Sequence, residues 1–223
     1  TDYITWDSLT LDDDFTIALW IKVEEATSWL AFVANNSNQN NFIGYFNSSN
    51  LGLRFSDGTG VNNISIEEYV IGQWNRMVVT RDKSASEMYV YYNGKLVKTI
   101  TSSDYGNINN DLVTQSLGAW ASGYYHINAK VSDYQIWDKK WELSDVQYDY
   151  KHPDRSILDN GSLTSGITQS NIMLWYPMNN ENANTPQTSI LNAKPIELGS
   201  ELIVNGSLTG TATTALTLAT SNN

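Results

Sequence analysis

The sequence predicts an all-β protein, an antiparallel β-sandwich followed by an irregular C-terminal extension. Residues 15–23 alternate strictly between large apolar and other side chains, which is the pattern of a strand with one buried face. Turn-forming residues recur between short apolar runs, as the many short strands of a sandwich require. The chain is also rich in Asn, Ser, Thr, Tyr and Trp and poor in Lys and Glu, which favours strands over helices. With 223 residues it is long enough to bury a core.

The first strands lie in the N-terminal quarter of the chain. The acidic run 12–14 is a charged turn that precedes the strand at 15–23. A loop rich in Asn follows at 35–41, and Ser56-Asp57-Gly58 ends the last apolar run of this region. Between these turn signals we predict strands over residues 29–34, 42–47 and 51–55.

The strongest local signal is a hairpin in the centre of the chain. Gln73–Asp82 and Glu87–Thr99 are strand-like runs separated by a polar turn. The second run folds back through Asn93-Gly94, because both positions of a tight hairpin turn need positive φ and these two residues accept it. The sequence therefore predicts three consecutive antiparallel strands here.

Later signals complete the sandwich and begin the extension. Strands are predicted over residues 112–120 and 126–137, and a short helix over 143–151, with Ser144 as its cap and Pro153 as its end. We therefore expect residues 1–153 to form the sandwich. Residues 154–223 are the C-terminal extension, which has little apolar content of its own and is expected to pack on the sandwich or on a neighbouring subunit.

Several of these segments together resemble a known family. They are the opening runs 2–6 and 14–21, the "YxNGKLV" hairpin at 91–97, the glycine-containing run 117–131 and the strand and helix start at 131–145. This combination resembles the laminin-G-like, concanavalin-A-like jelly-roll family, in the branch similar to pentraxins. The resemblance covers roughly residues 2–153. It implies a jelly roll of a kind that holds sugars or surfaces more often than it performs chemistry.

Two segments of the extension carry a second resemblance. Residues 171–179 and 201–207 are similar to segments found in phage and bacterial surface proteins. That resemblance implies a virion or a large surface protein, and so a location on the virion surface or outside the cell. Residues 209–223 are almost all Thr, Ala, Leu and Ser, which is compatible with a strand packed on another chain or with the entry to a further domain.

Composition excludes some partners. The chain has 24 acidic and 13 basic residues and a net charge of −11, which repels phosphate backbones and anionic membranes. We therefore expect no nucleic-acid partner and no membrane insertion, since no apolar run approaches the roughly 18 residues of a membrane span. There is no cysteine, so disulfide and thiol chemistry are excluded.

The acidic residues do not form a catalytic pair, so we expect no enzyme. A retaining glycosidase needs two carboxylates about 5 Å apart, which on a strand means acids two or four residues apart. Glu24-Glu25 and Glu67-Glu68 are adjacent and face opposite ways, and Asp12–Asp14 lie in a turn. His126 and His152 stand in no metal-site or triad pattern, and a strand-edge role is preferred for His126.

The aromatic residues suggest a surface for glycans. The chain holds 8 Trp and 13 Tyr, of which Trp20, Trp74 and Trp137 lie in strand patterns and are predicted to be structural. Other aromatic residues lie at strand ends or in a Gly/Ser loop beside amide side chains, where sugar rings can stack and form hydrogen bonds. Packing in the core or between subunits is an equal alternative. The predicted glycan-binding residues are Trp29, Tyr45, Trp120, Tyr124, Tyr125 and Asn128.

Calcium is the one cofactor that the sequence suggests. A calcium ion needs several oxygen ligands at converging loops, and Asp57, Asp133 and Asp2 are the candidates. Gly58 and Gly60 would allow backbone carbonyls to approach an ion near Asp57. The alternative is an ordinary turn in which Asp57 bonds its own backbone.

Three functions remain open at this stage. The first is a non-catalytic glycan-binding or adhesion module of a virion, such as a capsid decoration, fibre or tail protein, or of a large surface protein. Its partners would be glycans or a cell-surface polysaccharide, together with copies of itself or other virion subunits. The second is a purely structural oligomeric virion subunit, which an exposed apolar stripe along residues 202–218 would favour. The third is an accessory carbohydrate-binding module of a carbohydrate-active enzyme.

Overall fold

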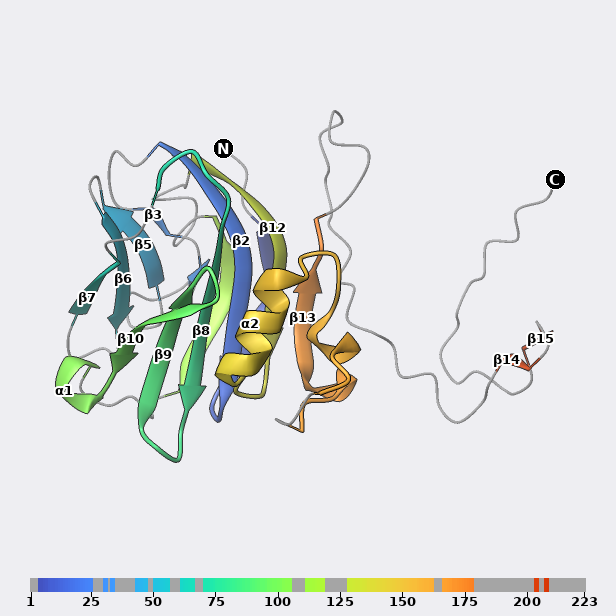
Figure 1. Ribbon diagram of the computed structural model, residues 1–223. Helices are drawn as coiled ribbons and strands as arrows, with labels where there is room; N and C mark the ends of the chain where they lie inside the picture. Colours follow the sequence, from blue (N-terminus) through green and yellow to red (C-terminus); the bar gives the residue numbers. More distant parts are fainter. Residues whose placement is uncertain are drawn as a thin grey trace.

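The chain folds as the predicted antiparallel β-sandwich (Figure 1). The computed structural model describes residues 4–25, 30–31, 33–34, 43–47, 50–56, 61–66, 70–105, 111–118, 128–162, 166–178, 203–204 and 207–208. Every strand pair within these ranges is antiparallel.

The larger layer is a six-stranded sheet in the order β10-β9-β8-β2-β12-β13. The last strand of this sheet, β13, comes from the predicted C-terminal extension, so the extension contributes to the sandwich. The six strands are β2 (Phe15–Glu25), β8 (Asn75–Asp82), β9 (Glu87–Tyr92), β10 (Lys95–Ile100), β12 (Asn128–Trp137) and β13 (Ile172–Tyr176).

The smaller sheets form the opposite layer. A three-stranded sheet has the order β1-β11-β4 and a four-stranded sheet the order β3-β5-β6-β7. The strand predicted over 29–34 is present as two short strands on either side of Phe32, and β7 was not predicted. These strands are β1 (Ile4–Leu11), β3 (Leu30–Ala31), β4 (Val33–Ala34), β5 (Ile43–Asn47), β6 (Asn50–Ser56), β7 (Val61–Ile66) and β11 (Leu112–Leu117).

Strand β2 shows why the sheet has two buried faces. Its odd-numbered apolar residues point into the sandwich, where Phe15 and Ile17 pack in one cluster with Leu11, Leu112 and Leu117 of β1 and β11. The alternation predicts that the opposite face is solvated, yet Thr16 on that face is 0% exposed. This outer face is buried in its first half because the segment around helix α2 (Leu143–Lys151) covers it.

The predicted hairpin is confirmed. Asn93 and Gly94 have φ of 49° and 77°, and they join β9 to β10 as expected. Gly94 is required for a second reason, because a Cβ there would lie 3.0 Å from Cδ1 of Tyr150 in the last turn of α2. The turn therefore fits both the backbone of the hairpin and the helix that lies over it.

Helix α2 has the predicted bounds but a different cap. Ser144 lies inside the helix, and the N-cap is Glu142, whose backbone is extended. The Glu142 N–H donates to Oδ2 of Asp145 at 2.9 Å, which supplies the cap that we assigned to Ser144. The helix covers an outer apolar cluster, separate from the main core, made of Ala18, Val78, Tyr91, Trp137, Trp141, Val146, Ile157, Ile167 and Ile172.

The remaining described elements are short. Helix α1 covers Ser102–Tyr105, and the 3-10 turns η1 and η2 cover Ile157–Asp159 and Gln169–Asn171. Strands β14 (Ile203–Val204) and β15 (Ser207–Leu208) pair with each other. None of the helices in the described part of the chain is long and apolar enough to cross a membrane.

An ion pair joins the end of β8 to the segment before α2. The Asp82 carboxylate accepts hydrogen bonds from Lys140 Nζ at 2.9 Å, from Ser84 Oγ at 2.7 Å and from the Ala85 N–H at 2.9 Å. These bonds, led by that from Lys140, lower the pKa of Asp82 from 3.8 to about 2. Since the pKa is lower in the folded state, the stabilisation is present at neutral pH and is lost as the pH falls from about 4 through 2.

We expect Asp82→Asn to lower the free energy of unfolding by about 1 kcal/mol at pH 7. The pKa shift corresponds to roughly 2 kcal/mol at most, and the partial exposure of the pair reduces it. Urea unfolding of both proteins should show this difference at pH 7 and its disappearance near pH 2. Asp154→Asn, at an exposed position after α2, is the control. A difference that stays constant between pH 7 and pH 2 would show that Asp82 does not contribute through its charge.

Candidate functional site

One of the predicted glycan-binding residues has a described side chain. Asn128 is exposed at the start of β12 and pairs with Glu25 at the end of β2. Tyr45 lies in β5 opposite Gly52 and Ala31, although only its backbone is described. Four further predicted residues lie outside the described residues: Trp29, Trp120, Tyr124 and Tyr125.

Of the three predicted calcium ligands, the structure describes Asp133. Asp57 and Asp2 lie outside the described residues, as does His126. Within the described ranges, no three His, Cys, Asp or Glu side chains are grouped so that they could hold a metal ion. A calcium site at Asp57, Asp133 and Asp2 therefore stays a prediction. The structure adds which protein groups the Asp133 carboxylate already binds.

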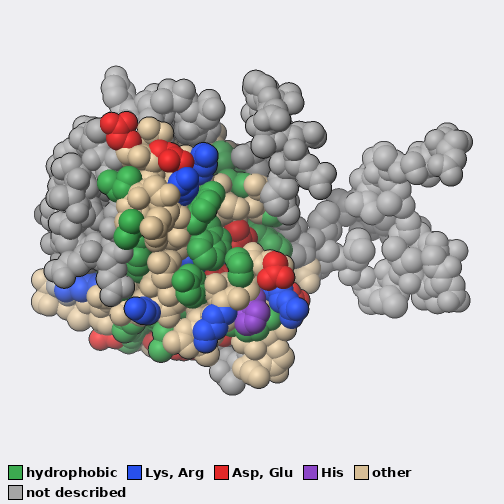
Figure 2. Space-filling view, turned by 45° about the horizontal axis from the view of Figure 1, so that its top comes forward, with side chains coloured by type: hydrophobic (Ala, Val, Ile, Leu, Met, Phe, Trp, Pro, Cys, Tyr) green, Lys and Arg blue, Asp and Glu red, His purple; other side chains and the backbone are tan. Residues whose placement is uncertain are grey.

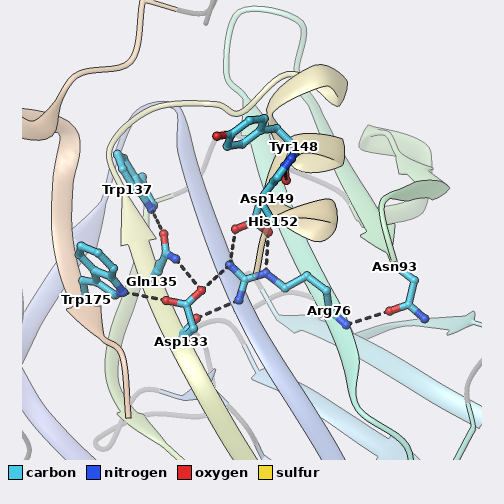
Figure 3. A network of polar contacts seen from close by, with 9 residues as sticks. All are labelled: Arg76, Asn93, Asp133, Gln135, Trp137, Tyr148, Asp149, His152 and Trp175. Carbon is cyan, nitrogen blue, oxygen red and sulfur yellow. Dashed lines mark hydrogen bonds and ion pairs between the residues drawn. The ribbon is translucent and has the colours of Figure 1, made fainter. Parts of the chain in front are cut away.

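A polar network beneath α2 is built around Arg76 of β8 (Figure 3). The guanidinium is 0% exposed and holds Asp149 of α2 through two hydrogen bonds, Nε to Oδ2 at 2.6 Å and Nη2 to Oδ1 at 2.7 Å. Its Nη1 donates to the Asp133 carbonyl at 2.9 Å, and Nη2 lies 3.0 Å from Asp133 Oδ2. Burial raises the pKa of Asp149 and the positive charge of Arg76 opposes that rise. Arg76 therefore allows two carboxylates to lie under the helix.

The network continues from Asp133 to the edge of the sheet. Asp133 has φ of 50° and lies at a register shift of β12, which turns its carboxylate toward β8 and β13. Its Oδ2 accepts from Gln135 Nε2 and its Oδ1 from Trp175 Nε1, both at 2.7 Å. Gln135 Oε1 in turn accepts from Trp137 Nε1 at 2.9 Å. One chain of contacts thus links α2, β8, β12 and β13 (Figure 3).

The network also holds the hairpin turn. The Arg76 N–H donates to Asn93 Oδ1 at 2.9 Å, and the Asn93 N–H donates to the Arg76 carbonyl at 2.9 Å. At the other end of the network, His152 caps the C-terminus of α2 and stacks on Tyr148 at 4.2 Å between ring centroids. Both carboxylates of the network bind the same guanidinium, which compensates part of their negative charge. We therefore interpret the network as the scaffold of the outer face.

Helix α2 ends before it reaches one end of the large sheet. Tyr150 in the last turn of α2 stacks on Trp20, with 5.9 Å between ring centroids, and β2 runs on past that point to Glu25. Figure 1 shows the upper part of β2 and β12 extending beyond the helix. We call this region the open end of the sheet and define it as Lys22–Glu25, Val70–Trp74 and Asn128–Lys130.

Within the described residues, three of the five exposed large apolar side chains lie in the turn of the open end. Val70, Ile71 and Trp74 are 46%, 45% and 45% exposed. The turn that carries them stays beside β2, because the Gly72 N–H donates to the Val23 carbonyl at 2.8 Å. Figure 2, in which the top of Figure 1 comes forward, shows hydrophobic side chains at the surface with basic and acidic side chains near them.

The prediction that Trp74 is a core residue is therefore wrong, whereas Trp137 is buried at 1% exposure as predicted. Trp74 precedes β8 instead of lying within it, and α2 ends before reaching this part of the sheet. The preceding Gly72-Gln73 was the signal that this Trp belongs to a turn. Trp20 lies between the two cases, because it is half-buried under Tyr150.

Charged side chains accompany this turn. Lys22 of β2 pairs with Lys130 of β12, and the two ammonium groups lie 3.4 Å and 3.6 Å from Glu24 Oε1. All three side chains are partly or largely accessible. The open end therefore offers donors, an acceptor and an indole on one accessible surface, which is the mixture that a hydroxylated ligand needs.

Comparison with protein families identifies the fold. The family model described as the concanavalin A-like lectin/glucanases superfamily, Laminin_G_3, matches residues 1–147. A search of curated proteins finds no match.

Solved structures with the same fold have low sequence identity. A candidate carbohydrate binding protein from Bacteroides ovatus has a TM-score of 0.55 at 12% identity, over 85% of this chain and 54% of that one. NanB sialidase from Streptococcus pneumoniae, as its K499G mutant, has a TM-score of 0.52 at 18% identity, over 64% and 27%. The receptor binding domain of botulinum neurotoxin C/D mosaic serotype has 0.50 at 13%, over 63% and 36%. This chain therefore spans about half or less of each of these three proteins.

Proposed function

The chain belongs to the concanavalin A-like lectin/glucanases superfamily, and from this premise we propose that it is a non-catalytic glycan-binding module. The observation that carries the proposal is the open end of the sheet, where an exposed indole lies among Lys, Glu and Asn side chains. Sugar rings present apolar C–H faces that pack on aromatic rings and hydroxyl groups that bond to such polar side chains. Asp133 and Asp149 beneath α2 both bind the Arg76 guanidinium, which supports a role for them in the fold.

The predicted aromatic residues extend this proposal to the loops. Asn128 lies at the open end, and Trp29, Tyr45, Trp120, Tyr124 and Tyr125 are proposed as further sugar contacts. Calcium bound by Asp57, Asp133 and Asp2 is proposed as an aid to that binding. The fold shared with a candidate carbohydrate binding protein of Bacteroides ovatus supports the same class of function.

We place this module at a surface. The resemblance of residues 171–179 and 201–207 to phage and bacterial surface proteins supports an adhesion role on a virion or a large surface protein. Its ligand would then be a cell-surface polysaccharide or another exposed glycan, and the chain would act as a homo-oligomer or beside other virion subunits. An accessory module of a carbohydrate-active enzyme would use the same surface.

A glycan-array screen of the purified chain, with and without calcium and with light scattering for its mass, tests the proposal. Binding that Trp120→Ala removes while the fold survives would support a lectin-like module with the predicted loop contacts. Loss of binding in chelator alone would support the calcium site. If no glycan binds and the chain forms a stable trimer or larger assembly, the glycan proposal fails and a structural subunit replaces it.

A further inference from the structure

We propose that Trp74 is the stacking platform for a neutral pyranose ring, at a site that needs no metal ion. The proposal deepens the proposed function and rests on it, since it names the ligand class and the contact residue at the open end. It also differs from the sequence prediction, which assigned Trp74 to the core. Stacking on an indole requires no cation, so this site is independent of the predicted calcium ligands.

The indole of Trp74 is available to a ligand. It makes no hydrogen bond and no ring contact within the described residues, and it is 45% exposed. The other described tryptophans are engaged. Trp6, Trp137 and Trp175 donate their Nε1–H to protein oxygens, while Trp20 and Trp141 pack against other rings.

The turn that holds Trp74 is fixed before any ligand arrives. Asn75 is 3% exposed, and its Nδ2 donates to the Gln73 carbonyl at 2.9 Å and the Val70 carbonyl at 3.4 Å. Asn93 Nδ2 donates to Asn75 Oδ1 at 3.1 Å, which ties the turn to the hairpin above Arg76. A platform held in this way loses little conformational entropy on binding, which favours weak ligands such as sugars.

The size of the apolar surface selects a small occupant. Covering the exposed parts of Val70, Ile71 and Trp74 would bury on the order of 300 Å², given that a whole aromatic side chain buries 150–250 Å². A stable interface between proteins buries about 800 Å² on each partner. The apolar surface that these described residues expose is therefore smaller than a protein interface, and it suits one or two sugar rings.

Charge selects a neutral ligand. The open end holds two lysines, Lys22 and Lys130, which share Glu24, and a second glutamate, Glu25, so its formal charges sum to zero. The chain as a whole carries a net charge of −11, which repels acidic polysaccharides and anionic lipid surfaces. Lys22 lies on the strand next to the turn and Lys130 one strand further, about 10 Å across the sheet, so both can donate to the hydroxyl groups of a short neutral oligosaccharide.

The test is calorimetric titration, in EDTA and separately with calcium, with light scattering for the mass of each protein. The ligands are neutral hexasaccharides (cellohexaose, mannohexaose, xylohexaose and chitohexaose) and an anionic oligogalacturonate. The wild-type chain is compared with Trp74→Ala, Trp74→Phe and Leu96→Ala. Leu96 is the matched control, because it is an equally exposed apolar residue, at 47%, on β10 of the same sheet. If Trp74→Ala does not fold, Trp74→Gln takes its place.

We expect at least one neutral hexasaccharide to bind the wild-type chain in EDTA. Its affinity for Trp74→Ala should be about tenfold or more lower than for the wild-type chain. The affinity should be largely kept in Trp74→Phe and unchanged in Leu96→Ala. Equal affinity in all four proteins, binding only with calcium, or binding of the anionic oligomer alone overturns this inference and leaves the proposed glycan function standing. A dimer that dissociates in Trp74→Ala overturns it in favour of a second copy. Binding of no glycan, here or on the array, overturns both proposals.

Discussion

Replacing Arg76 by methionine is expected to lower the free energy of unfolding by about 3–5 kcal/mol. The substitution leaves the carboxylate of Asp149, which is 3% exposed, buried without its cation. Asp133 loses the same partner but keeps hydrogen bonds from Gln135 and Trp175. The effect therefore comes mainly from Asp149 and from the contact between α2 and β8. Differential scanning calorimetry should show a decrease in Tm on the order of 10 °C.

The pH dependence of this variant separates charge from packing. With Arg76 removed, burial raises the pKa of Asp149 unopposed, so its folded pKa lies above its unfolded value. A group of that kind destabilises the fold progressively as the pH rises through its folded pKa. We therefore expect Arg76→Met to be less stable at pH 8 than at pH 5, relative to the wild-type chain at each pH.

Two further variants complete this experiment. Arg76→Met combined with Asp149→Leu removes both charges and should recover much of the lost stability, because an apolar pair of similar volume can replace a buried ion pair. Lys130→Met breaks an accessible pair with Glu24 and should change stability by less than about 1 kcal/mol. If Arg76→Met costs no more than Lys130→Met, the network does not stabilise the outer face.

The sequence predicts the strands of the sandwich well because their signals are local. The alternation in residues 15–23, the Asn93-Gly94 turn and the helix over 143–151 all depend on neighbours in the chain. Arg76 was missed because its partners Asp133 and Asp149 lie 57 and 73 residues away along the chain. A signal existed nonetheless, since an arginine before the apolar run Met77–Val79 must find a buried acceptor once that strand is central in the sheet.

The candidate site could be predicted less well than the strands, because its exposure depends on distant parts of the chain. Whether a tryptophan near a strand is covered depends on where a distant helix ends, and residues 70–75 carry no local sign of α2. The prediction for Trp74 failed because it passed over the turn signal at Gly72-Gln73 and because α2 ends before that turn, while the one for Trp137 succeeded because α2 covers it. Among the predicted glycan-binding residues, Asn128 is placed at the open end. Its pairing with Glu25 follows from the register of β12 on β2, which is a property of the whole sheet.

Replacing Trp141 by alanine is expected to lower the free energy of unfolding by about 3–5 kcal/mol, through a cavity between α2 and the sheet. Trp141 is 0% exposed, and its ring packs edge-on against Trp137 with 5.5 Å between centroids. It also stands where the chain enters α2, and its N–H donates to Thr16 Oγ1 at 2.9 Å. The backbone bond remains in the variant, so the loss reports the side chain alone.

Phenylalanine in place of Trp141 or of its neighbour Trp137 distinguishes ring packing from hydrogen bonding. The Nε1 of Trp141 is buried and has no hydrogen-bond partner among the described residues. Trp141→Phe therefore removes a group that contributes nothing favourable, and it should cost less than half as much as Trp141→Ala. Trp137 Nε1 donates to Gln135 Oε1, so Trp137→Phe leaves that oxygen without its donor beneath the helix, although Gln135 Nε2 stays bonded to Asp133. We therefore expect Trp137→Phe to cost about 1 kcal/mol more than Trp141→Phe. Urea unfolding of the three variants and of the wild-type chain measures both differences. Equal losses for the two phenylalanine variants would mean that the bond from Trp137 to Gln135 does not stabilise the network, and that the outer face depends on ring packing alone.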